Sequence, residues 1–257
     1  MQEVIIIITA FLASGLTFFS GFGLGTILLP VFAVFFPVEI AVALTAIVHF
    51  LNNVFKFFLV GKSIDKRVLL RFGIPAIAAA FLGAYLLNYL SELKPFFEYQ
   101  LLGKIFEITA IKVIIAVLLI FFSLFDLLPM LKNLQFNKKY LPIGGLLSGF
   151  FGGISGNQGA LRSAFLIRVG LTKESFIATG IAIACLIDIS RLSVYFENIS
   201  NHRESLNWNL VILATISAFV GAYLGNKILK KITISFLQKF VAIALIIFSV
   251  FLGMGIL

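Results

Sequence analysis

Continuous runs of apolar residues dominate this 257-residue chain, and they restrict it to very few folds. Hydrophobic residues make up 61% of the sequence and charged residues only 12%, which is too little polar surface to coat a soluble protein. In a lipid bilayer, only helices and closed barrels satisfy every backbone hydrogen bond. The runs lack the alternation of a membrane barrel strand. The sequence therefore predicts an all-α integral membrane bundle.

The sequence also repeats itself. Residues Ala80–Asn88 return as Ala218–Asn226, at an offset of 138, with seven of nine positions identical. Leu12–Gly15 similarly return as Leu146–Gly149, at an offset of 134. Internal duplication of this kind is typical of secondary transporters, in which the binding site lies where the repeats meet. The expected division is a first membrane repeat over residues 1–130, a cytoplasmic linker over 131–140 and a second membrane repeat over 141–257.

Ten hydrophobic elements are expected, five in each half. They are Val4–Phe19, Leu24–Phe36, Ile40–Val60, Phe72–Leu90 and Ile108–Leu128, and then Leu141–Ile154, Ala160–Val169, Ser175–Phe196, Asn209–Leu229 and Phe236–Leu257. The third to fifth elements of each half reach the ~20 residues that cross a bilayer. The second is too short and follows the first without a polar loop, which predicts broken or re-entrant helices. No basic region precedes the first element, so we expect it to remain in the mature protein.

Basic residues predict the orientation of the bundle. They gather at 61–71, 131–139 and 227–239, whereas the segments 91–107 and 197–207 mix acids with few bases. The positive-inside rule makes the first set cytoplasmic and the second external. With five elements in each half, the two repeats are then inverted and both termini are external. Because this placement accounts for the net charge of +9, no nucleic-acid partner is expected.

Two glycine-rich joints, at Ser20–Gly25 and Ser155–Gly159, are candidate anion sites. Glycine lets the backbone leave a helix and approach a ligand closely. A short helix that starts there directs free N–H groups toward an anion. Tight helix packing through small residues is the structural alternative. The candidate binding residues in these joints are Gly21, Gly23, Gly25, Ser155, Gly156, Asn157, Gln158 and Gly159.

Polar side chains inside the third element of each half are further candidates, because an ionisable group costs ~2.5–3.5 kcal/mol at the bilayer centre. The two stripes are His49, Asn53 and Lys56 at i, i+4 and i+7, and Asp188, Arg191 and Tyr195 at i, i+3 and i+7. At an offset of 135, Asn53 matches Asp188 and Lys56 matches Arg191. Asn52 adds a further amide beside the first stripe. Each half thus offers one polar stripe with one cation.

A structural explanation stands beside each charged candidate. Asp188 and Arg191 could simply neutralise each other, and Lys56 could extend to the cytoplasmic surface. His49 could accept protons, or it could be a neutral ring with a packing partner. Arg162, three residues after Gly159, either binds an anion or anchors its element at the cytoplasmic face.

Two blocks of sequence carry a more specific pattern. The first comprises Gly21–Thr26, Leu29–Pro30, Thr45–Ala46 and His49–Lys56, and the second comprises Gly152–Ser163 and Ala178–Gly180. Together they resemble the sulfite exporter TauE/SafE family, and the resemblance covers essentially the whole chain. It implies a permease of the bacterial inner membrane that moves a small anion, often sulfite or an organosulfonate, usually outward.

An enzyme and a channel are the alternative functions. Gly153–Gly156 fits the G-x-S-G pattern of rhomboid intramembrane proteases, in which Ser155 would need His49 within hydrogen-bonding reach. A channel would need a continuous polar pore, whereas the polar groups here concentrate near the repeat axis. The single cysteine and the scattered histidines and carboxylates favour neither a redox centre nor a metal site, so no cofactor is expected.

The mechanism that we expect is alternating access. An anion binds between the two joints, where Asn52, Asn53, Asn157 and Gln158 donate hydrogen bonds, and Lys56, Arg162 and Arg191 balance its charge. Rocking of one repeat against the other exposes the site to each side in turn. Coupling to protons would use His49 or Asp188. The expected partners are the anionic solute and the lipid bilayer, with a homodimer left open.

Overall fold

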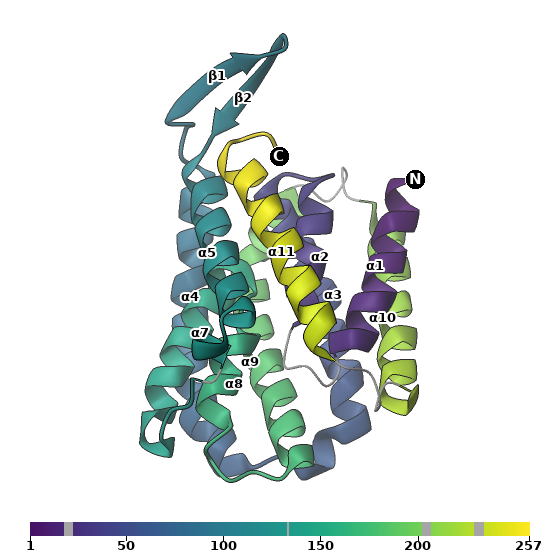
Figure 1. Ribbon diagram of the computed structural model, residues 1–257, viewed down its shortest axis with the longest axis vertical. Coiled ribbons are helices and arrows are strands. Elements are labelled where there is room, and N and C mark those ends of the chain that lie inside the picture. The colour runs from purple at the N-terminus through teal and green to yellow at the C-terminus, as the bar shows by residue number, and fades with distance from the viewer. Residues whose placement is uncertain (18–22, 133, 202–206, 229–233) are drawn as a thin grey trace.

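The structure is a computed structural model that describes residues 1–17, 23–132, 134–201, 207–228 and 234–257. Its helices pack side by side into one bundle (Figure 1). The first half contains α1 (Gln2–Thr17), α2 (Leu24–Ala33), α3 (Val38–Val60), α4 (Lys66–Ser91) and α5 (Ala110–Leu127). The second half contains α7 (Leu141–Ser155), α8 (Gly159–Leu166), α9 (Lys173–Asn201), α10 (Trp208–Ile228) and α11 (Ile234–Gly253). Each expected hydrophobic element therefore forms a helix, and the all-α membrane bundle is confirmed.

Within the described part of the chain, four stretches are long and apolar enough to cross a membrane: Val38–Ser63, Lys66–Ser91, Lys173–Phe196 and Trp208–Lys227. The first includes the 3₁₀ turn η1 (Gly61–Ser63) after α3. The fifth helices are α5, with 18 residues, and α11, with 20 residues. Helix α5 begins at Ala110 rather than at the expected Ile108, because the Thr109 side chain caps it by accepting a hydrogen bond from the Lys112 amide.

The segment between α4 and α5, expected to be a loop, forms a β-hairpin. Strand β1 (Phe97–Leu101) pairs antiparallel with β2 (Lys104–Ile108), and Figure 1 shows the hairpin projecting beyond the end of the bundle. Tyr99 and Phe106 face each other and stack, with ring centroids 5.5 Å apart. Such cross-strand aromatic pairs stabilise a short hairpin.

Between the two halves lie the short helix α6 (Pro129–Lys132) and the 3₁₀ turn η2 (Lys138–Tyr140). After them, α7 and α8 form a helical hairpin. Gly156 ends α7 in the left-handed conformation, with φ of 76°. The Ser148 hydroxyl donates to the Gln158 carbonyl, and nearer the open end the Phe136 amide donates to the Ala164 carbonyl. The chain thus enters and leaves this hairpin at the same end of the bundle.

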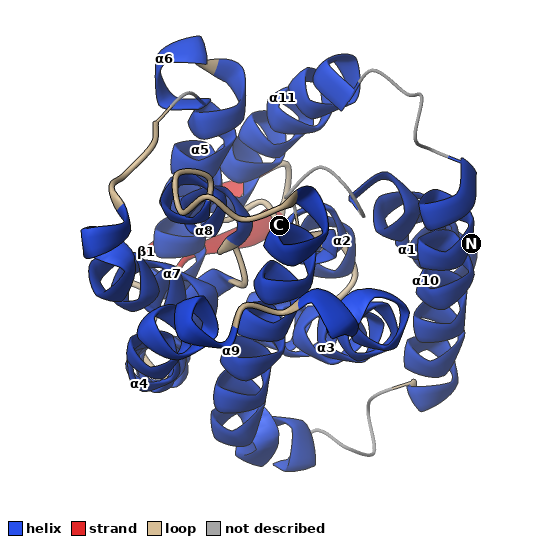
Figure 2. Cartoon of the chain, turned by 90° about the horizontal axis from the view of Figure 1, so that it is seen from below, coloured by secondary structure: helices blue, strands red, loops and turns tan. Residues whose placement is uncertain are grey.

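The helices of the two halves pack in a reciprocal pattern, seen along the bundle in Figure 2. Helix α1 packs on α10, and α7 packs on α4, so the first helix of each half meets the fourth helix of the other. The repeated glycines Gly83 and Gly221 make these contacts, since a Cβ atom would collide with the carbonyl oxygens of Phe150 and Phe11, respectively. Helices α3 and α9 pair between these two layers, and α5 pairs with α11. Each half thus supplies packing partners for the helices of the other half.

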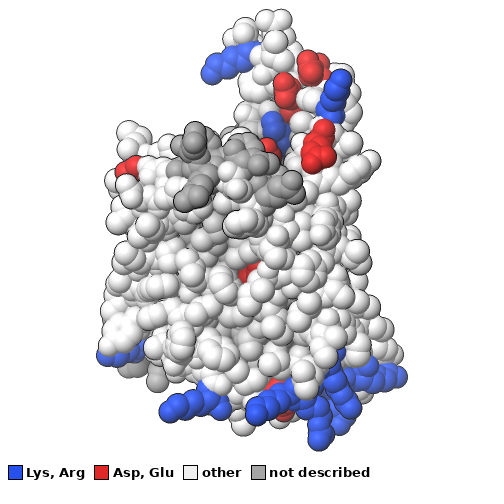
Figure 3. Space-filling view, turned by 180° about the vertical axis from the view of Figure 1, so that it is seen from behind, with Lys and Arg blue, Asp and Glu red and all other residues white. Residues whose placement is uncertain are grey.

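The charged residues divide between the two ends of the bundle. Figure 3 shows most lysines and arginines at the end opposite the hairpin. Both termini lie at the hairpin end (Figure 1). The Tyr99 hydroxyl donates to the Met254 carbonyl at 2.7 Å, which joins the C-terminal segment to the hairpin. We refer below to the basic end and the hairpin end.

Candidate functional site

The two predicted joints meet near the middle of the bundle. A Cβ atom at Gly25, in the first turn of α2, would lie 3.8 Å from the carbonyl oxygen of Gly156, at the tip of the α7–α8 hairpin. Helices α3 and α9 pass this point in opposite directions. After the end of α3, the Asp65 backbone amide donates to the Thr179 hydroxyl of α9, and within α3 the Asn53 side-chain amide donates to Asp188. Helix α9 begins at the basic end, whereas α3 begins at the hairpin end.

The two polar stripes meet through the Asp188 carboxylate. Its Oδ2 atom lies 2.7 Å from His49 Nδ1 and accepts a hydrogen bond from Asn53 Nδ2 at 3.3 Å. Its Oδ1 atom accepts from Arg191 Nε at 3.0 Å and lies 2.8 Å from Arg191 Nη2. The expected Asp188–Arg191 pair is present, but His49 joins it from the other half. Asp188 and Arg191 are fully buried, so this group is part of the interior of the bundle.

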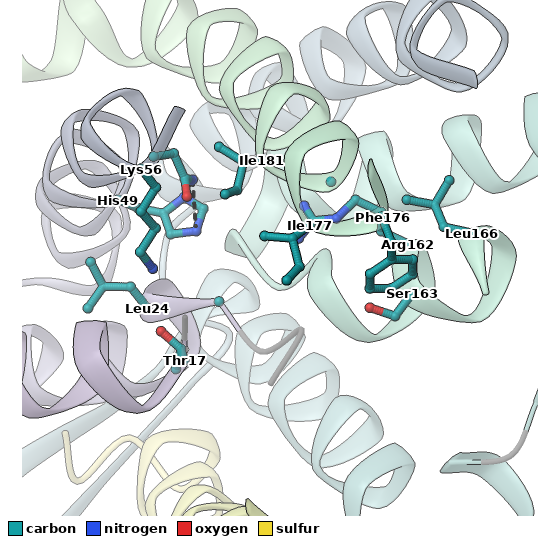
Figure 4. A pocket seen from close by; sticks show the side chains of 13 residues that line it. Thr17, Leu24, His49, Lys56, Arg162, Ser163, Leu166, Phe176, Ile177 and Ile181 are labelled. Carbon is teal, nitrogen blue, oxygen red and sulfur yellow. Dashed lines mark hydrogen bonds between the residues drawn. The ribbon is translucent and has the colours of Figure 1, made fainter. Parts of the chain in front are cut away.

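A cavity of about 60 Å³ lies on the basic side of this group. Figure 4 shows His49 and Lys56 on one wall, and Arg162 and Ser163 on the other. Asn53 also lines it, and so do Thr17, Gly23, Leu24, Leu166, Phe176, Ile177, Gly180 and Ile181. The cavity has room for a few waters or one small oxyanion. Because Phe176 and Ile177 belong to the first turns of α9, it reaches toward the basic end.

The two cations of the cavity come from different halves of the chain. Lys56 is buried, with 4% of its surface exposed, and so does not extend to the cytoplasmic surface. Its Nζ atom lies 3.2 Å from the Asn52 amide oxygen in the amide orientation that satisfies both groups. Arg162 Nη1 donates to Gln158 Oε1 at 3.2 Å. The Arg162 side chain thus faces the cavity rather than anchoring α8 at the surface.

The remaining predicted site residues lie around the cavity or outside the described part of the chain. Gly21 belongs to residues 18–22, which the structure does not describe. The structure brings Gly23, His49, Asn53, Lys56 and Arg162 together in the cavity wall. The others are buried next to it rather than in its lining: Gly25, Asn52, Ser155, Gly156, Asn157, Gln158, Gly159, Asp188 and Arg191.

Sequence reasoning missed the apolar residues of the cavity wall and also Thr17, Ser163 and Gly180. Ser163 and Gly180 belong to the motif blocks that carry the family resemblance, which was the available signal. Thr17 ends α1, where its hydroxyl donates to the Ala13 carbonyl, and only its closeness to the first joint could have suggested a role.

The serine and histidine of the protease alternative are both engaged elsewhere. The Ser155 hydroxyl donates to the Phe151 carbonyl at 3.0 Å and accepts from the Asn157 amide at 3.3 Å. His49 binds Asp188 instead. Among the described residues, no three His, Cys, Asp or Glu side chains gather where they could hold a metal ion.

Long apolar helices around a buried, cation-lined cavity place the chain in the class of polytopic membrane permeases. The family model described as Sulfite exporter TauE/SafE matches residues 6–252. The chain therefore belongs to the sulfite exporter TauE/SafE family, whose members are transporters rather than enzymes. A comparison with curated proteins finds no match.

Proposed function

We propose that the protein exports a small sulfur oxyanion, such as sulfite or an organosulfonate, by alternating access. The family supplies the transport activity and the sulfur-anion class. The observation that carries the proposal is the cavity between the halves, because Lys56 from α3 and Arg162 from α8 face the same small volume. A cavity lined by charges of one sign concentrates ions of the opposite sign.

The chemistry of the cavity wall suits an oxyanion. The planar Arg162 guanidinium matches the geometry of paired oxygen atoms, and Lys56 adds a compact positive charge. Helix α2 starts at the cavity after Gly23, so the N–H groups of its first turn and its positive dipole end favour an anion there. The Asn53 amide and the His49 ring supply further polar contacts.

The interior of the bundle is closed between the cavity and the hairpin end, which supports alternating access rather than a continuous pore. Beyond His49 and Asp188, toward the hairpin end, the Arg191 and Tyr195 side chains are almost fully buried. The Tyr195 hydroxyl donates to the Gly153 carbonyl and so joins α9 to α7. A cavity on one side and a packed interior on the other is the arrangement that a permease has in one of its two end states.

The positive-inside rule assigns the basic end to the cytoplasm. The cavity would then face inward, both termini and the β-hairpin would be external, and the protein would be a multi-pass component of the bacterial inner membrane. Residues 1–130 and 141–257 would act as the two inverted repeats, joined by the cytoplasmic linker at 131–140. Rocking between them would release the anion outside.

The test is thermal unfolding of the detergent-solubilised protein with sulfite, sulfate, sulfoacetate, taurine, chloride and nitrate. A ligand that binds only the folded protein stabilises it by ~2.7 kcal/mol at a hundredfold excess over its Kd. We expect stabilisation by a sulfur oxyanion and not by chloride or nitrate. An equal response to all anions, or none, would contradict the proposed substrate class. Single-channel currents in planar bilayers would contradict alternating access.

A further inference from the structure

Four buried side chains beside the tip of the α7–α8 hairpin carry polar atoms without hydrogen-bond partners among the described residues. One is Gln158, at Nε2, and the others are Asn157 at both amide atoms, Thr45 at its hydroxyl and Arg191 at Nη1. The exposed fractions of Asn157, Thr45 and Arg191 are 3%, 1% and 0%. Buried polar groups almost always have partners, because an unpaired one away from water is unfavourable. A polar group of this kind is therefore expected to meet either ordered water or a ligand.

Asn157, Thr45 and Arg191 surround Gly156. A Cβ atom on Gly156 would lie 2.6 Å from Arg191 Nη1, so the absence of a side chain leaves the guanidinium edge uncovered. The Thr45 methyl group and the Gly156 carbonyl oxygen both lie beside Gly25, at 3.5 Å and 3.8 Å from the position of its Cβ atom. Asn157 directly follows Gly156 and precedes α8. Thr45, Asn157 and Arg191 thus belong to three different helical segments that approach one another at Gly156.

This group lies on the opposite side of His49 and Asp188 from the cavity. Thr45 is one helical turn from His49 toward the hairpin end, and Arg191 is about one turn from Asp188 in the same direction. Lys56 lies on the basic side. Arg191 matches Lys56 at the repeat offset of 135. These two matched cations, one from each half, therefore lie on opposite sides of the contact between His49 and Asp188.

We propose that Thr45, Asn157 and Arg191 form a second oxyanion subsite, which receives the transported anion on its way from the cavity to the hairpin end. The inference rests on the proposed function and adds a specific place to it. Arg191 Nη1, Asn157 Nδ2 and the Thr45 hydroxyl donate hydrogen bonds to the oxygen atoms of the anion. The Asp188 carboxylate contacts both His49 of the cavity and Arg191 of the subsite, so it separates the two.

The test uses Thr45→Val and Asn157→Leu, which remove polar atoms while nearly keeping side-chain volume. If these atoms serve only the packing, both variants should fold at least as well as the natural protein and transport normally, because they remove unpaired polar groups. If they bind the anion in transit, sulfite efflux from proteoliposomes should fall about tenfold or more, the effect of losing a hydrogen bond to a charged group. Sulfite should still raise the Tm of both variants, because Lys56 and Arg162 remain.

Thr215→Val is the matched control. Thr215 is also buried, but its hydroxyl donates to the Val211 carbonyl of its own helix. This variant should keep the natural rate of sulfite efflux. Natural efflux in both Thr45→Val and Asn157→Leu would overturn the subsite and leave the cavity proposal standing. If sulfite neither raised the Tm of the natural protein nor was transported by it, the proposed function would be contradicted, and the subsite with it.

Discussion

His49 on α3 and Asp188 on α9 form a buried hydrogen bond across the two halves of the chain, with 2.7 Å between Nδ1 and Oδ2. Asp188 also binds Arg191 on its own helix. One carboxylate therefore balances the cation of its own half and holds the histidine of the other. Motion of one half against the other would alter this contact, so we propose it as the place where transport is coupled to protons.

Removing the carboxylate should destabilise the fold strongly. In Asp188→Ala, Arg191 stays buried without its counter-ion, and breaking a buried pair in this way costs about 3–5 kcal/mol. Thermal unfolding in detergent measures the loss. Asp65→Ala is a control that removes only the α4 cap, where Asp65 Oδ1 accepts from the Val68 amide, and should cost about 1 kcal/mol. Equal Tm values for the two variants would contradict a structural role for Asp188.

Neutralising either cation of the cavity should weaken anion binding without unfolding the protein. Hydrogen bonds to charged groups contribute about 1.5–3 kcal/mol, so Lys56→Gln and Arg162→Gln should each raise the Kd for sulfite roughly 10–100-fold. Isothermal titration calorimetry in detergent measures the change. Lys62→Gln, at an exposed position just after α3, should bind like the natural protein. Natural affinity in a folded Arg162→Gln variant would remove this residue from the site.

The repeated glycines Gly83 and Gly221 should respond alike to substitution. At both positions a Cβ atom would collide with a backbone carbonyl, which cannot move aside as a side chain could. Gly83→Ala and Gly221→Ala should each lower the free energy of unfolding by about 1–3 kcal/mol, as overpacking does. Gly253→Ala, where the nearest atom is the Ala116 Cβ at 3.4 Å, should be nearly neutral. Chemical unfolding in mixed micelles would detect the difference, and a neutral Gly221→Ala would argue against reciprocal packing.

Thiol labelling should report the orientation. In a Cys185→Ala background, Leu102→Cys at the hairpin tip should react with a membrane-impermeant maleimide on intact spheroplasts. Lys139→Cys, in the turn before α7, should react only after the membrane is opened. The positive-inside rule gives this pattern, and the reverse pattern would place the cavity on the external side.

Much of this fold follows from local patterns in the sequence. Long apolar runs determine the helices, and Gly156 marks the break between α7 and α8 where the glycine-rich joint predicted one. The β-hairpin escaped prediction because Phe97–Leu101 is a short run between two helices, and its pairing with β2 depends on contacts outside that run. From its composition, segment 91–107 was expected to be a loop that mixes acidic residues with few basic ones.

The site is harder to foresee because its contacts join distant parts of the chain. The offset of 135 brought Asn53 and Asp188 into correspondence, but nothing local indicates that His49 binds Asp188. The burial of Lys56 depends on the packing of α2, α9 and α10 around α3, so the sequence alone left a position at the surface open as an alternative. That the side-chain amide of Asn157 lacks hydrogen-bond partners among the described residues can be seen only in the three-dimensional structure.

Because helices of the first half pack on helices of the second half, the bundle can be completed only after the second half has been synthesised. Helix α1 is synthesised first, yet its packing partner α10 begins only at Trp208. At about 5–20 residues per second, α1 waits roughly 10–40 s in the membrane before α10 leaves the ribosome. During that interval Gly15 and Ser14, which are buried in the finished protein, face lipid or a chaperone. The first half is thus a nascent intermediate that only its own C-terminal half can complete.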